Sequence, residues 1–118
     1  MEQEPSKVGQ PAFKVFWHPG TKQDFAKMPP SLVDSIVRAA THRLSRAPQL
    51  IGEPLKGTVQ RLWKIRFSKY RIIYTIQAKR DEVWILAVLK RDIAYRHRHV
   101  ESLLRLAVAL QEEVDQPK

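Results

Sequence analysis

Apolar residues along this chain recur with two periods, every second position in some segments and every third or fourth in others, which predict strands and helices respectively. Four segments are rich in β-branched and aromatic residues, as is typical of strands. They are residues 13–17, 62–67, 70–76 and 83–89. The connections between the last three are too short for a crossover helix, so we expect these strands to pair antiparallel as a meander.

Helical periodicity appears in three other segments. We expect a short helix from Thr21 to Met28 and a second one starting at Ser31, with Asp34 placed as in a capping box. Apolar residues recur every three or four positions along the second helix and predict its buried side. They are Val33, Ile36, Val37, Ala40 and Leu44. A third helix is expected over residues 100–110, and its apolar stripe either packs on the sheet or receives a helix of a partner protein.

This order of elements predicts an α+β domain, because the helices and the strands are grouped separately along the sequence. We expect an N-terminal strand, a helical hairpin on one face of the sheet, a three- to four-stranded antiparallel meander and a C-terminal helix. The 118 residues suffice for one domain with one core, which we place at residues 11–111. The polar segments 1–10 and 112–118 are expected to be a disordered N-terminal segment and a frayed tail.

Composition excludes several classes of protein. The chain has no cysteine, which excludes a disulfide framework and a thiolate metal site. Its first residues lack the features of a secretory signal, and its apolar runs fall far short of the ~20 residues of a membrane-spanning helix. It has no glycine-rich phosphate loop and no zinc-binding motif. We therefore expect a soluble, cytoplasmic protein with no cofactor, no metal and no membrane partner.

The net charge of the chain is concentrated in its second half. There are 21 Lys and Arg residues against 12 Asp and Glu residues, a formal net charge of +9. Residues 56–98 hold twelve of the cations and three of the anions, so the rest of the chain is balanced. A polyanion, and nucleic acid first of all, is the partner that such a segment favours. The alternative is a solvated basic surface without a ligand.

The alternation of side chains along the predicted strands places several of these cations together. Lys64 and Arg66 project from the face opposite the apolar residues of their strand, and Arg71 on the next strand approaches them after a two-residue turn. Like charges on adjacent strands repel, so a bound anion is a natural explanation for the cluster. The alternative is an edge strand that carries cations to discourage aggregation. At the end of the last strand, Arg91 and Tyr95 add residue types that phosphate chemistry uses.

An ordered set of motifs in this sequence resembles the RelE/ParE superfamily of bacterial and archaeal toxins from toxin–antitoxin systems. After the helical hairpin come Pro54-Leu55-Lys56-Gly57, Leu62-Trp63-Lys64-Ile65-Arg66, Tyr70-Arg71-Ile72-Ile73-Tyr74 and Lys90-Arg91-Asp92-Ile93-Ala94-Tyr95. The likeness covers residues 13–96. It implies a compact sheet-and-hairpin fold and a cognate antitoxin protein that wraps and neutralises the toxin.

The superfamily divides by function. RelE-like members are endoribonucleases that cleave mRNA in the ribosomal A site, and their activity depends on strand cations together with a C-terminal Arg and Tyr. The matching positions here are Lys64, Arg66, Arg71, Arg91 and Tyr95. ParE-like members poison DNA gyrase and generally lack the complete set. The resemblance therefore favours the nuclease, with a gyrase poison or an inactive basic binding module as the alternatives.

Under the nuclease interpretation, a ribose 2′-hydroxyl attacks the adjacent phosphate without a metal. Arg66 and Arg71 would hold the phosphate, Tyr95 or Lys64 would accept the hydroxyl proton, and Arg91 would assist the leaving oxygen. The Glu-Pro-Leu-Lys stretch also resembles YoeB-like relatives, in which the glutamate serves as general base. Glu53 is therefore an alternative base or else a solvated loop carboxylate. Further candidates for RNA binding are Lys56, Arg61, Lys69 and Lys90.

Overall fold

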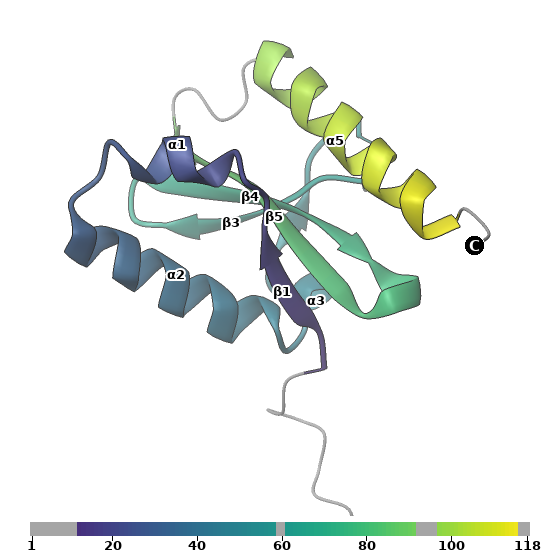
Figure 1. Ribbon diagram of the computed structural model, residues 1–118, viewed down its shortest axis with the longest axis horizontal. Helices are drawn as coiled ribbons and strands as arrows, with labels where there is room; N and C mark the ends of the chain where they lie inside the picture. The colour runs from purple at the N-terminus through teal and green to yellow at the C-terminus, as the bar shows by residue number, and fades with distance from the viewer. Residues whose placement is uncertain (1–11, 59–60, 92–96, 116–118) are drawn as a thin grey trace, which may run out of the picture.

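The computed structural model describes residues 12–58, 61–91 and 97–115. At its centre lies a five-stranded sheet with the strand order β1-β5-β4-β3-β2 (Figure 1). The strands are β1 (Lys14–Trp17), β2 (Glu53–Pro54), β3 (Trp63–Phe67), β4 (Tyr70–Gln77) and β5 (Glu82–Lys90). A 3₁₀ turn, η1 (Ala78–Arg80), connects β4 to β5.

Three of the strands form the antiparallel meander that the sequence predicts, since β3 pairs with β4 and β4 with β5. The sheet is larger than the three to four strands expected, because two further strands flank the meander. β2 pairs antiparallel with the start of β3 through two residues only. β1 pairs parallel with β5, so the sheet is mixed. β1 can pair parallel with β5 because a long connection, which includes three helices, separates the two strands along the chain.

The helices are α1 (Thr21–Phe25), α2 (Pro30–Leu44), α3 (Pro48–Ile51) and α5 (His97–Asp115). α1 is shorter than the helix expected to reach Met28. α2 begins at Pro30, where the fixed φ of proline suits the first helical position and its missing N–H is no loss. No side chain caps this end, so the capping box expected at Ser31 and Asp34 is wrong.

Helices cover both faces of the sheet (Figure 1). α1, α2 and α3 pack on one face, where the predicted stripe of α2 contributes the buried Ile36, Ala40 and Leu44 to one core. α5 covers the other face and contributes the buried Leu103 and Ala107 to a second core. Of the two interpretations of the C-terminal stripe, packing on the sheet is the one observed.

The C-terminal helix is longer than expected. It continues beyond Leu110 to Asp115, because the added residues include Gln and Glu, which favour helices, and the next proline is Pro117. The segment 1–10 lies outside the described residues, and the domain limits at residues 11 and 111 stay a prediction. Within the described ranges, no helix combines the length and the apolar character needed to span a membrane.

One edge of β5 has a strand neighbour along only part of its length. β1 pairs with β5 from Glu82 to Ile85, whereas β5 continues to Lys90. α1 packs against β5, and Asp24 Oδ2 accepts a hydrogen bond of 2.9 Å from the backbone N–H of Val88. The Asp24 carboxylate thus supplies Val88 with the hydrogen-bond acceptor that a neighbouring strand would otherwise provide.

Candidate functional site

A cavity of about 520 Å³ lies at the end of the sheet where the β3–β4 turn meets the C-terminal end of β5. It is lined by Arg66, Ser68, Lys69, Arg71, Lys90 and Arg91. Five of these six residues are cations and none is acidic, so its electrostatic potential favours an anion. We call it the cationic cavity.

The register of the sheet brings these cations together. Arg66 on β3 lies directly opposite Arg71 on β4, as the strand alternation predicts. The backbone N–H of Arg91 donates to the carbonyl oxygen of Lys69 at 2.8 Å, which joins the end of β5 to the turn. From α2, Arg43 Nη1 donates to the carbonyl oxygen of Arg66 at 3.1 Å. The backbone at this end of the sheet therefore holds the cations in place despite their mutual repulsion.

Arg71 is the buried member of the cationic cavity. It is 6% exposed, and its Nη1 donates to the carbonyl oxygens of Ser68 at 3.3 Å and of Tyr70 at 3.0 Å. Its Nε and Nη2 make no hydrogen bond to any residue in the described part of the chain, which leaves these donors to an anion. A guanidinium held by two carbonyl groups needs little reorganisation to bind the oxygens of a phosphate.

Ser68 lines the cavity, although sequence reasoning does not identify it. Its φ is 55°, in the left-handed region that few residues other than glycine, asparagine and aspartate adopt. The available signal is the two-residue connection Ser68-Lys69 between two strands, because tight hairpin turns require positive φ. This conformation belongs to the turn whose Ser68 carbonyl holds Arg71.

A second cavity, of about 400 Å³, lies beside the start of β3. It is lined by Glu53, Pro54, Leu55, Lys56, Lys64 and Val100. We call it the mixed cavity, because apolar side chains and charges of both signs line it. Lys64 and Arg66 share one face of β3, yet they line different cavities. The register of β2 on β3 places Glu53 opposite Lys64.

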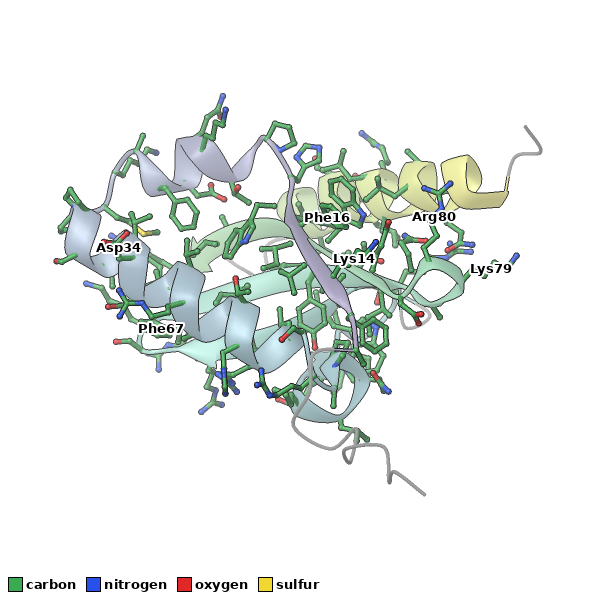
Figure 2. The ribbon with its side chains drawn as sticks, turned by 60° about the horizontal axis from the view of Figure 1, so that its bottom comes forward. Lys14, Phe16, Asp34, Phe67, Lys79 and Arg80 are labelled. Carbon is green, nitrogen blue, oxygen red and sulfur yellow. The ribbon has the colours of Figure 1, made fainter. Side chains whose placement is uncertain are left out.

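Not every cation of the basic segment lines the cationic cavity. Arg61 is exposed and lines neither cavity, and Tyr95 lies outside the described residues. Lys79 and Arg80 belong to the β4–β5 turn, and Figure 2 shows them far from Phe67 at the β3–β4 end of the sheet. The basic segment is thus divided between two ends of the sheet. No three His, Asp or Glu side chains in the described ranges are grouped so that they could hold a metal ion.

Comparisons with known proteins identify relatives of this chain. Residues 15–95 match the family model described as the ParE toxin of type II toxin-antitoxin system, parDE. The chain is similar to Toxin RelG of Mycobacterium tuberculosis, with 33% identity over 75 residues, which cover 64% of this chain and 86% of RelG. It also resembles a chain in the crystal structure of the toxin–antitoxin complex RelBE2 of the same organism, with 31% identity, a TM-score of 0.62 and coverage of 69% of this chain and 99% of that chain.

A more distant likeness extends to a mutant of the E. coli toxin RelE in the free state. The TM-score is 0.63 at 14% identity, over 80% of this chain and 97% of the other, so this match shows a shared fold. The family model spans well over half of this chain and includes every residue of the cationic cavity. The resemblance inferred from the order of the motifs is therefore confirmed. The chain belongs to the RelE/ParE superfamily and is a toxin of a type II toxin–antitoxin system.

Proposed function

We propose that this toxin is a ribosome-dependent endoribonuclease, which cleaves mRNA in the ribosomal A site and so inhibits translation. The observation that carries this proposal is the cationic cavity, in which five Lys and Arg residues converge without a carboxylate. Cleavage of a phosphodiester without a metal requires the protein to neutralise the charge that develops on the phosphate.

The proposed reaction is attack of a ribose 2′-oxygen on the adjacent phosphorus, followed by departure of the 5′-oxygen of the next nucleotide. The products are a 2′,3′-cyclic phosphate and a free 5′-hydroxyl. Arg71 presents its remaining donors to the phosphate oxygens, and the exposed Arg66 opposite it supplies a second positive charge. Arg91, at the end of β5, steadies the leaving oxygen.

We assign the role of general base, which accepts the proton of the 2′-hydroxyl, to Tyr95 or to Lys64. Lys64 lies on the same face of β3 as Arg66 but in the mixed cavity, so its role requires the RNA to span both cavities. Glu53 is the alternative base, and it also lines the mixed cavity. Comparison of the pH–rate profiles of the variants Tyr95→Phe and Glu53→Gln distinguishes the two bases.

We assign a cognate antitoxin protein as the physiological partner. The solved relative at 31% identity is described as a toxin–antitoxin complex, which supports this assignment. An antitoxin that neutralises this chain must mask or distort the cationic cavity, and acidic segments are suited to that task because the chain carries a net charge of +9.

The test is primer extension on mRNA from cells in which the toxin is briefly induced, beside the variants Arg71→Ala and Arg91→Ala. We expect cuts within translated codons for the wild type and a loss of about 10²–10³-fold in cleavage for Arg71→Ala, the usual cost of removing one donor that stabilises developing charge. Arg38→Ala is the matched control, because Arg38 is an exposed arginine of α2 that lines neither cavity. Wild-type cleavage by both cavity variants would refute the assignment of the site.

Poisoning of DNA gyrase is the second candidate function, which the description of the matching family model as a ParE toxin favours. It predicts growth arrest with DNA breaks and an induced DNA-damage response, but no cuts in mRNA. The same induced cultures distinguish the two functions. A culture with neither arrest nor cuts would indicate an inactive basic binding module.

A further inference from the structure

The mixed cavity lies next to the cationic cavity along β3. Lys64 lines one and Arg66 the other, and residues two apart on a strand lie on the same face about 7 Å apart. This separation is comparable with the length of one extended nucleotide. An RNA strand with a phosphate in the cationic cavity can therefore reach the mixed cavity with an adjoining nucleotide.

The mixed cavity is lined by two cations, Lys56 and Lys64, and one carboxylate, Glu53, and its apolar walls suit a nucleobase. Pro54, Leu55 and Val100 give it apolar surface, on which the flat face of a base can pack. Glu53 brings a carboxylate, which repels phosphate and accepts hydrogen bonds from N–H groups. The Glu53 carboxylate is exposed and has no ion pair or hydrogen bond with any residue of the described ranges.

The backbone around Glu53 is fixed, as recognition of a base requires. Glu53 pairs with Lys64 across the β2–β3 ladder, and the N–H of Leu55 donates to the carbonyl oxygen of Leu62 at 2.8 Å. Thr58 Oγ1 donates to the carbonyl oxygen of Leu55 at 2.8 Å, which closes the turn that follows. The Glu53 carboxylate thus projects from the short strand β2, which pairs with β3, the strand that carries Lys64.

We propose that the mixed cavity binds the base adjoining the cleaved phosphodiester and that Glu53 makes guanine the preferred base at that position. This inference rests on the proposed nuclease function and names a specificity-determining residue for it. In this role Glu53 recognises the nucleobase by hydrogen bonds and does not accept the 2′-hydroxyl proton.

The chemistry of the four RNA bases selects guanine. On its Watson–Crick edge, guanine presents two neighbouring donors, N1–H and N2–H, which match the two oxygens of a carboxylate. Adenine and cytosine present one donor beside a ring nitrogen acceptor, which repels the second oxygen. Uracil presents one N–H between two carbonyl groups. Such a bidentate pair discriminates against other bases by roughly 5- to 150-fold.

The experiment maps the 5′-hydroxyl ends of RNA from cells induced for the wild type and for the variant Glu53→Gln, and counts the bases on both sides of each cut. We expect guanine to be enriched at one side of the wild-type cuts. A glutamine amide presents one donor and one acceptor, so Glu53→Gln should lose the guanine preference and favour bases that offer a neighbouring donor and acceptor. Asp34→Asn is the matched control, because it makes the same charge change at an exposed site on α2, which covers the other face of the sheet (Figure 2). This control should keep the wild-type base distribution.

A second measurement uses ribosomes programmed with an mRNA in which inosine replaces guanine at a mapped site. Inosine lacks the 2-amino group, so the wild type should cleave it about 10-fold more slowly, whereas Glu53→Gln should not distinguish the two bases. An equal loss of cleavage by Glu53→Gln at every site, with unchanged base frequencies, would overturn the inference and leave the nuclease in place. A wild type that makes no cuts would overturn the nuclease proposal and this one together.

Discussion

At the scale of single residues, the hydroxyl of Tyr74 fixes α3 to the sheet. Tyr74 is fully buried on β4, and its hydroxyl donates to the carbonyl oxygen of Pro48 at 2.6 Å. Gly52 makes this approach sterically feasible, because a Cβ atom there would collide with the Tyr74 hydroxyl and lie 2.8 Å from the carbonyl oxygen of Lys64. The start of β2, and with it Glu53, is thus positioned by a contact in the core.

This contact predicts a pH-dependent difference between the wild type and the variant Tyr74→Phe. Burial raises the pKa of the Tyr74 hydroxyl above its usual range, and the nearby Arg43 opposes part of this effect. The folded state therefore keeps the proton to a higher pH than the unfolded state, so the contribution of the hydroxyl is complete below its unfolded pKa of 10.0 and is lost as the pH rises further. We expect Tyr74→Phe to cost about 1 kcal/mol at neutral pH and less at higher pH.

Urea unfolding of both proteins between pH 7 and pH ~11 measures this difference. Tyr70→Phe is the matched control, since it removes a hydroxyl from the same strand that forms no hydrogen bond within the described part of the chain. A difference between wild type and Tyr74→Phe that stayed constant above pH 10 would contradict the buried donor.

At the scale of elements, Asp24 replaces a strand partner on the edge of β5. Its carboxylate accepts the Val88 N–H, beyond the last residue that β1 pairs. We predict that Asp24→Ala lowers the free energy of unfolding by about 1–3 kcal/mol, because it leaves this backbone donor without its acceptor. Amide hydrogen exchange should show faster exchange at Val88.

The variant Asp24→Asn separates the hydrogen bond from the charge. Its amide oxygen accepts the same N–H, so we expect it to retain most of the stability and of the protection at Val88. Equal losses in the two variants would indicate that the negative charge, rather than the hydrogen bond, stabilises α1 against β5.

The sequence predicts an element well when the interactions that determine it join residues close together along the chain. The meander follows from short connections, and the buried stripe of α2 from its periodicity, so both are predicted correctly. The parallel pairing of β1 and the two-residue β2 depend on contacts between distant segments, which no local pattern encodes. The convergence of Arg66 with Arg71 follows from strand alternation, but the separation of Lys64 into another cavity depends on where β2 and α5 pack.

At the scale of the whole molecule, the cationic cavity lowers the stability of the free protein. Arg66 lies opposite Arg71 in a sheet whose net charge is already positive, and like charges across a strand pair are destabilising. We predict that Arg66→Thr raises the melting temperature at low salt, by the equivalent of about a few tenths of a kcal/mol, since exposed charges are screened. High salt should remove this gain.

Inorganic phosphate provides the complementary measurement. It should stabilise the wild type more than Arg66→Thr, because a ligand of the folded state shifts the unfolding equilibrium. Arg61→Thr is the control, as it removes the same charge from an exposed position outside both cavities. An equal response of both variants to phosphate and salt would indicate an effect of net charge alone.

The parallel pairing of β1 with β5 also determines how much of the chain must be synthesised before the sheet can form. Lys14 lies beside Glu82, so about 70 residues must be translated before the first strand finds its partner. The cationic cavity itself needs Lys90, the last residue of β5, and Arg91, which follows it. A nascent chain that stalls before this point lacks the cationic cavity, so a toxin whose activity depends on this cavity becomes active only after the sheet is complete. An antitoxin present at that moment binds a folded toxin. The amount of antitoxin that is needed is therefore set by the number of completed toxin chains and not by the number of chains whose synthesis has begun.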